Sequence, residues 1–81
     1  PFNPSTQIRY ALPEDAMVTI SIYDMMGRKV RTLVSQSMSP GYHTTLWNAT
    51  NDKGLAVSAG MYIYMIQAGT YHHMKKMVLL K

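Results

Sequence analysis

Three histidines, His43, His72 and His73, are the only imidazoles in the chain and are its first candidates for chemistry. A zinc site needs three or four ligands in a fixed geometry. His72 and His73 are neighbours in a segment with strand character, so their side chains point to opposite faces and do not converge on one ion. The chain has no cysteine, which excludes disulfides, thiolate ligands and a cysteine nucleophile. We therefore expect packed or exposed strand histidines, and no metal site.

Oxygen-bearing side chains gather at Asn48, Asn51 and Asp52, just before Gly54. A calcium loop is one interpretation of this cluster, but the alternating oxygen ligands and the distant glutamate of an EF-hand are missing. Asn and Asp are also ordinary turn residues. Both interpretations stay open at this point, and a plain turn is favoured.

Residues for nucleophilic or acid–base catalysis are sparse. Ser58 precedes Gly60 but lacks the Gly-x-Ser-x-Gly pattern of a nucleophile elbow. No Gly-rich phosphate loop follows a predicted strand. The acids lie in predicted turns, where nothing pairs them across a cleft, and they are Glu14, Asp15, Asp24 and Asp52. The sequence therefore predicts that the domain is not an enzyme and takes no cofactor.

Positive charge predominates, with eight Lys and Arg against four Asp and Glu and a net charge of +4. Two basic clusters carry it, Arg28-Lys29-Arg31 and Lys75-Lys76-Lys81. They could meet an anionic partner such as nucleic acid or lipopolysaccharide. Solvated strand faces and gatekeepers on an edge strand explain them equally simply, and we favour that interpretation. Tyr62 and Tyr64 alternate as on a base-stacking platform, but their apolar neighbours indicate core, so no nucleic acid is expected.

The elements that must position these residues are short β-strands, separated by glycines at 27, 41, 54, 60 and 69. Alternation is clearest at residues 17–23, where Val18, Ile20 and Ile22 face one way. Strands are expected at residues 7–12, 17–23, 28–34, 42–47, 55–57, 61–67 and 71–80. About seven strands in one short chain predict an all-β, immunoglobulin-like antiparallel sandwich.

Several details of this sandwich follow from the same patterns. Residues 24–27 are typical of a hairpin turn, and 35–41 of a polar loop. Val30 and Leu33 break the alternation of the third strand, which indicates a bulge. Residues 61–67 are apolar on both faces, as in a central strand, and pair with 71–80 as a hairpin. The predicted core residues are Ile20, Ile22, Trp47, Tyr62, Tyr64 and Ile66.

A chain of 81 residues makes one domain at most. It starts at Pro1 without a leader, and no apolar run approaches the roughly 18–20 residues that cross a bilayer. We interpret residues 1–81 as a single C-terminal domain of a longer exported protein, with any leader upstream.

Short motifs follow one another along the chain in a family-like order. They are Pro1-Phe2-Asn3-Pro4-Ser5-Thr6, Ile22-Tyr23-Asp24 with Gly27-Arg28, Gly41-Tyr42-His43 with Trp47, Gly60-Met61-Tyr62-Ile63-Tyr64, and Lys76-Met77-Val78-Leu79-Leu80-Lys81. In order and spacing the whole chain resembles the C-terminal sorting domain, type A, of the bacterial type IX secretion system.

This resemblance implies a secretion signal that directs a cargo protein through the outer membrane and is then removed or exchanged for a surface anchor. The implied partners are the outer-membrane translocon, its sortase-like cysteine peptidase and an upstream cargo domain, for example a hydrolase. The implied location is the periplasm in transit, then the cell surface or the medium. The sorting residues implied are Gly60, Tyr62, Lys76, Met77, Val78, Leu79, Leu80 and Lys81.

A second family overlaps in pattern, the Ig-like domain of the flagellar hook-capping protein, which shares the Gly-x-Tyr strand. It implies the alternative function, an Ig-like structural or interaction spacer in a larger extracellular protein. We take the opening and closing motifs as favouring sorting. In either family the last strand is a free edge that could add to a partner's sheet, or pair with a second copy in a homodimer.

Overall fold

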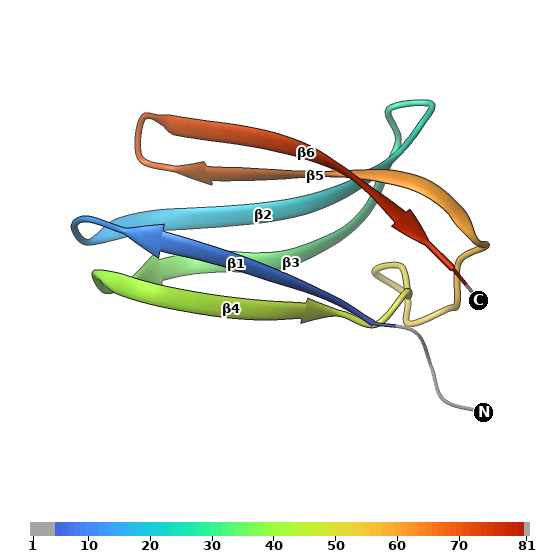
Figure 1. Ribbon diagram of the computed structural model, residues 1–81, viewed down its shortest axis with the longest axis horizontal. Coiled ribbons are helices and arrows are strands. Elements are labelled where there is room, and N and C mark those ends of the chain that lie inside the picture. The colour runs from blue at the N-terminus through green and yellow to red at the C-terminus, as the bar shows by residue number, and fades with distance from the viewer. Residues whose placement is uncertain (1–4, 81) are drawn as a thin grey trace.

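The computed structural model describes residues 5–80, which form six β-strands and no helix long and apolar enough to span a bilayer. The strands are β1 (Thr6–Leu12), β2 (Ala16–Asp24), β3 (Lys29–Met38), β4 (Gly41–Trp47), β5 (Gly60–Ala68) and β6 (Tyr71–Leu79). They pair in two antiparallel sheets, β1-β4 and β3-β2-β5-β6, which stack face to face (Figure 1). The predicted Ig-like sandwich is confirmed.

Strand β2 lies inside the larger sheet, between β3 and β5. Its alternating apolar residues, Val18, Ile20 and Ile22, all point inward and have no exposed surface. Burying one such side chain contributes roughly 1.5–3 kcal/mol relative to leaving it in water. The other buried core residues are Ile8, Leu12, Trp47, Ala49, Tyr62, Ile66, Ala68 and Leu79. Tyr64, also expected in the core, is only partly buried and packs against it.

Trp47 joins the two sheets. It ends β4 and is completely buried. Its ring meets the ring of Tyr62 on β5 edge-to-face, with centroids 5.1 Å apart. Both polar tips are satisfied, because Trp47 Nε1 donates to the carbonyl of Thr50 at 2.8 Å and the Tyr62 hydroxyl donates to the carbonyl of Ser58 at 2.6 Å. The pair therefore brings apolar area into the core without leaving an unpaired donor.

The prediction of a seventh strand at residues 55–57 is wrong. This segment contributes only an isolated bridge between Thr50 and Ala56. The reason is local: Asn51 Oδ1 accepts hydrogen bonds from the backbone N–H groups of Lys53 and Leu55. The backbone N–H of Asn51 in turn donates to the carbonyl of Leu55. The chain closes on itself as a tight turn, so it does not extend across a sheet.

The expected loop at 35–41 is also wrong over most of its length, because β3 continues to Met38. Its last residues pair with the start of β2, from Thr19↔Ser35 to Ala16↔Met38. The side chains at 35–37 are polar and exposed. Backbone pairing holds residues 35–37, and Met38 alone packs against the core, so no hydrophobic alternation marks this segment in the sequence.

The predicted irregularity in β3 is confirmed, and it occurs twice. The register shifts between Ile20 and Ser21, and again between Ile22 and Tyr23. Each shift leaves one extra residue on β3, Leu33 and Val30 respectively. Both pack against the core. The bulges thus turn the odd-spaced apolar residues inward, which regular alternation would have left in solvent.

Asp24 organises the turn between β2 and β3. The N–H of Gly27, at φ +83°, donates to the Asp24 carbonyl. Asp24 Oδ1 accepts from the N–H groups of Met26 at 2.9 Å and Arg28 at 3.0 Å, and Oδ2 accepts from Arg28 Nε at 2.9 Å. These hydrogen bonds lower the pKa of the Asp24 carboxyl from its ordinary value of 3.8, and the bond from the Arg28 backbone N–H has the largest effect.

We predict that Trp47→Ala lowers the free energy of unfolding by about 3–5 kcal/mol, because the completely buried ring leaves a cavity. Thermal unfolding measures the loss. Its control is Leu46→Ala on the neighbouring residue, which points outward and is 59% exposed, and which should change stability by no more than about 0.5 kcal/mol. An unchanged melting temperature in Trp47→Ala would contradict the position of the ring.

We predict that Asp24→Ala lowers the melting temperature at pH 7 and that this deficit disappears in acid. A carboxyl whose pKa is lowered by folding stabilises the folded state above its unfolded pKa, and the effect is lost as pH falls through the folded pKa. Melting temperatures between pH 7 and pH 2 test this. Asp15→Ala removes the same charge from the exposed turn after β1 and controls for net charge. A deficit that is constant with pH would show that the carboxylate charge is not the cause.

Candidate functional site: an apolar sheet face

The motif residues proposed for sorting divide between fold and surface. Gly60 begins β5 at φ +148°, a conformation that favours glycine, and a Cβ there would meet no atom within 4 Å. Tyr62 is a core residue. The backbone conformation at Gly60 and the core position of Tyr62 therefore explain these two residue types without a role in sorting.

The closing motif alternates across the last strand. Met77 packs against the core and Leu79 is buried in it, whereas Lys76, Val78 and Leu80 are exposed. Lys81 and residues 1–4 of the opening motif lie outside the described residues. Strand β6 is the outer strand of the larger sheet and pairs with β5, as expected. The motif does not form one continuous surface.

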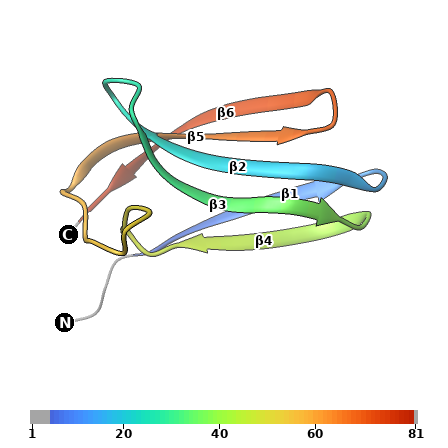
Figure 2. The same ribbon diagram turned by 180° about the vertical axis from the view of Figure 1, so that it is seen from behind.

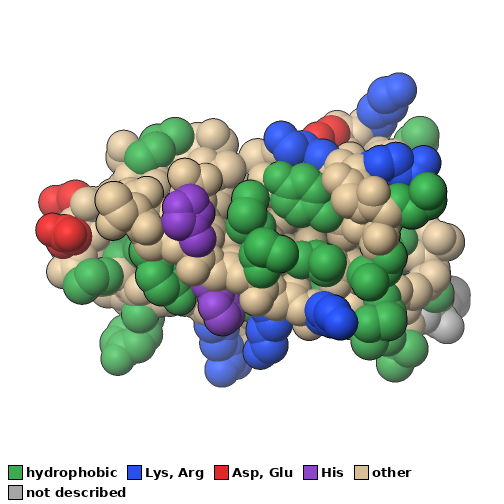
Figure 3. All heavy atoms as spheres, turned by 90° about the horizontal axis from the view of Figure 1, so that it is seen from above, with side chains coloured by type: hydrophobic (Ala, Val, Ile, Leu, Met, Phe, Trp, Pro, Cys, Tyr) green, Lys and Arg blue, Asp and Glu red, His purple; other side chains and the backbone are tan. Residues whose placement is uncertain are grey.

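The structure reveals an apolar patch that the sequence did not single out, on the side of the larger sheet that faces away from β1 and β4. Directly opposed residues of β5 and β6 build it, in the pairs Met61↔Val78 and Met65↔Met74, with Ile63 between the two methionines of β5. Val78 and Met74 are 58% and 61% exposed. In Figure 3 hydrophobic side chains gather on the face seen from above, with Lys and Arg around them. We call these five residues the outer patch.

A shallow hollow of about 300 Å³ continues the outer patch toward the turn after β2. It is lined by Tyr23, Asp24, Met25, Gly27, Ile63, Met65 and Met74. Tyr23 stands directly opposite Ile63 in the register, so its ring extends the apolar surface onto β2. Methionine side chains are flexible and polarisable, which lets such a surface adapt to a partner.

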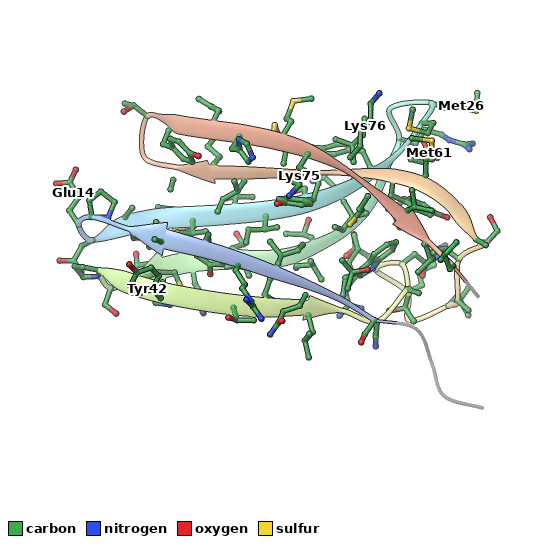
Figure 4. All side chains as sticks on the ribbon, viewed as in Figure 1. Glu14, Met26, Tyr42, Met61, Lys75 and Lys76 are labelled. Atoms are coloured by element: carbon green, nitrogen blue, oxygen red, sulfur yellow. The ribbon has the colours of Figure 1, made fainter. Side chains whose placement is uncertain are left out.

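Positive charge borders the outer patch. Lys76 is paired with Ile63 and so shares its face, and Lys29 is paired with Tyr23. Figure 4 shows Lys76, Met61 and Met26 at the same end of the molecule. The nearby Asp24 carboxylate is already paired with Arg28. The border is therefore basic, and the patch fits an apolar partner with acidic flanks.

The residues considered for metal binding are placed apart or occupied. Nε2 of His43 donates to the carbonyl of Ser39 at 2.7 Å, and its ring stacks on Tyr10. His72 and His73 lie on opposite faces of β6, as the register with Gln67 and Ile66 requires. Within residues 5–80 no three His, Cys, Asp or Glu side chains gather as a metal site would need.

The oxygens that suggested a calcium loop accept hydrogen bonds within the protein. Arg31 Nη1 donates to Asn48 Oδ1 at 3.1 Å, and the N–H of Thr32 donates to Asp52 Oδ1 at 3.0 Å. Asn51 Oδ1 caps its own turn. The contacts with Arg31 and Thr32 fasten the 48–54 turn to β3. This arrangement agrees with the interpretation of the cluster as a plain turn.

Comparison with known proteins assigns the family. The model of the FlgD Ig-like domain matches residues 3–71 of the chain. The chain belongs to the FlgD Ig-like domain family. A crystal structure of FlgD from Xanthomonas campestris, described in connection with the hook capping essential for flagellar assembly, matches with a TM-score of 0.72 at 22% identity. The match covers 95% of this chain and 56% of that chain. No curated protein matches the chain.

The expectation of a type IX sorting domain is wrong, because both matches lead to FlgD. Two of the residues behind it have roles in the sandwich itself. Gly60 supplies a backbone conformation, and Tyr62 packs on Trp47. Residues with such structural roles indicate architecture and do not discriminate between functions.

Proposed function

We propose that this domain is a non-catalytic Ig-like structural and interaction module of a larger extracellular protein of the hook-capping kind. Membership of the FlgD Ig-like family carries the proposal. The similar Xanthomonas protein is associated with hook capping, and the match spans only 56% of its length. The proposal therefore takes the chain as one part of a longer protein of that kind. Its extracellular location belongs to the proposal.

The outer patch is the surface through which this module contacts its neighbours. Its apolar residues lie on a regular sheet, so the surface is held in place by backbone pairing on both β5 and β6. Contiguous exposed apolar surface on a soluble domain marks interaction sites. The basic border adds orientation and restricts the choice of partner. A homodimer through the edge of β6 stays a prediction.

The module's role is tested in the organism that encodes the chain, by in-frame deletion of residues 1–81 from the parent gene. We expect the truncated protein to be produced but not to support hook assembly, which electron microscopy of the cell envelope and motility assays measure. Hooks of normal number and length in the deletion strain would contradict a hook-capping role.

The outer patch is tested by the double variant Met61→Ser with Met74→Ser in the parent protein. Both side chains are substantially exposed, so the melting temperature should change little. Binding to the neighbouring subunit should weaken by about tenfold or more, the factor that corresponds to 1.4 kcal/mol.

The matched control replaces Tyr42 and Leu46 with Ser. These apolar residues are also largely exposed but lie on the outward side of β4, in the other sheet. The control should assemble normally. Equal loss of assembly in the two double variants would show that the outer patch is not the contact surface.

A further inference from the structure

The two sheets are unequal, and the smaller one has an open edge. Strand β1 pairs along its whole length with β4, from Thr6↔Trp47 to Leu12↔Gly41. Within residues 5–80 no strand pairs with its other edge. β1 and β6 lie on the side nearest the viewer in Figure 1, and β3 and β4 come forward when the molecule is turned in Figure 2. Strand β6 therefore overhangs the free edge of β1.

A groove of about 280 Å³ occupies the space between this edge and β6. One wall is five consecutive residues of β1, from Ile8 to Leu12. Consecutive residues line a groove only when the backbone edge itself faces it, because side chains of a strand alternate between faces. The opposite wall comes from the inward side of β5 and β6 and consists of Tyr64, Ile66, Tyr71, His73 and Lys75.

The inward side of β6 is exposed at this groove. Tyr71, His73 and Lys75 pair with the core-facing residues Ala68, Ile66 and Tyr64, so they share the inner face of the sheet. They remain accessible, with Tyr71 58% exposed, because no third strand of the smaller sheet lies opposite them. The Tyr71 and His73 rings stack at 6.4 Å, which gives this wall a flat aromatic surface.

The charged residues lining the groove are all basic. They are Arg9 and Lys75, and no Asp or Glu belongs to the lining. Arg9 donates to the neutral Gln7 Oε1, so its charge is uncompensated by that contact. Burial, with a smaller effect from Tyr71, raises the pKa of the Tyr64 phenol, so this side chain adds no negative charge to the groove at neutral pH. In Figure 4 Lys75 points toward the smaller sheet, and Lys76 points to the opposite face.

We propose that this groove binds an extended acidic peptide segment, which adds to the free edge of β1 as a third strand of the smaller sheet. Only an extended chain satisfies a row of unpaired backbone N–H and C=O groups. About five to seven residues match the length of β1 at roughly 3.3 Å per residue. Carboxylates on alternate residues of the segment share one side of the strand, and on the inward side they meet Lys75.

This inference goes beyond the proposed module function and uses a different surface, so either can fail alone. The probe is the acetylated and amidated hexapeptide (Val-Glu)₃, titrated into the ¹⁵N-labelled chain. We expect amide exchange to slow by about tenfold at those residues within 8–12 whose N–H groups face the free edge rather than β4, together with chemical-shift changes at Tyr71 and Lys75. The peptide (Val-Lys)₃ has the same alternation and the opposite charge, and should bind about tenfold more weakly.

Two adjacent lysines provide the matched variants. Lys75→Glu should weaken (Val-Glu)₃ binding by about tenfold or more, and Lys76→Glu, on the other face of the same strand, by less than about twofold. Equal effects of the two variants would overturn the proposal. Chemical-shift changes confined to the outer patch would also overturn it. The absence of binding at about 1 mM peptide, a concentration that detects weak binding, would do the same.

Methylation of the peptide backbone tests strand addition apart from charge. A strand presents every second N–H to its neighbour. N-methylation of one alternate set of residues should therefore abolish binding, and N-methylation of the other set should preserve it. If both methylated peptides bind as well as the parent peptide, the attraction is electrostatic only and no third strand forms.

Discussion

The contact between Trp47 and Tyr62 is what makes two sheets into one domain. The smaller sheet has only two strands, and two strands alone are marginal in water. Trp47 at the end of β4 reaches across to Tyr62 of β5 and is completely buried there. The chain has no disulfide to help, and a chain this short has a thin core. Packing at this junction, together with the buried β1 side chains Ile8 and Leu12, therefore has to hold β1 and β4 in place, and with them the β1 wall of the groove.

The unequal strand numbers decide which surfaces are left for binding. Four strands opposed by two leave the first part of β6 without a facing strand, so its inward residues Tyr71, His73 and Lys75 reach solvent, whereas Leu79 further along the strand is buried. One strand thereby contributes to two surfaces of different character. Lys75 faces the groove beside β1, and Lys76 borders the outer patch. Adjacent residues of one cluster thus lie on different faces, so the cluster does not form one continuous surface.

The fold could be predicted wherever burial leaves an alternation in the sequence. β2 was predicted almost to the residue, because Val18, Ile20 and Ile22 are all core residues. The end of β3 was missed because residues 35–37 are polar and exposed and only Met38 beyond them packs against the core, so backbone pairing leaves no alternation there. The segment at 55–57 was overpredicted because its apolar residues suggested a strand, while the side chain of Asn51 was already closing the turn.

The binding surfaces were harder to predict, for a physical reason. Met61, Ile63 and Met65 made β5 apolar on both sides, which indicates a central strand, and β5 is central in its sheet. Central pairing says nothing about whether a second layer covers the outer face. In the sequence, an apolar residue that packs in the core cannot be distinguished from an apolar residue that is exposed on the outer face of the sheet. Only the strand order shows that one layer lies below β5 and none above it within the described residues, and that distinction separates a core residue from an interface residue.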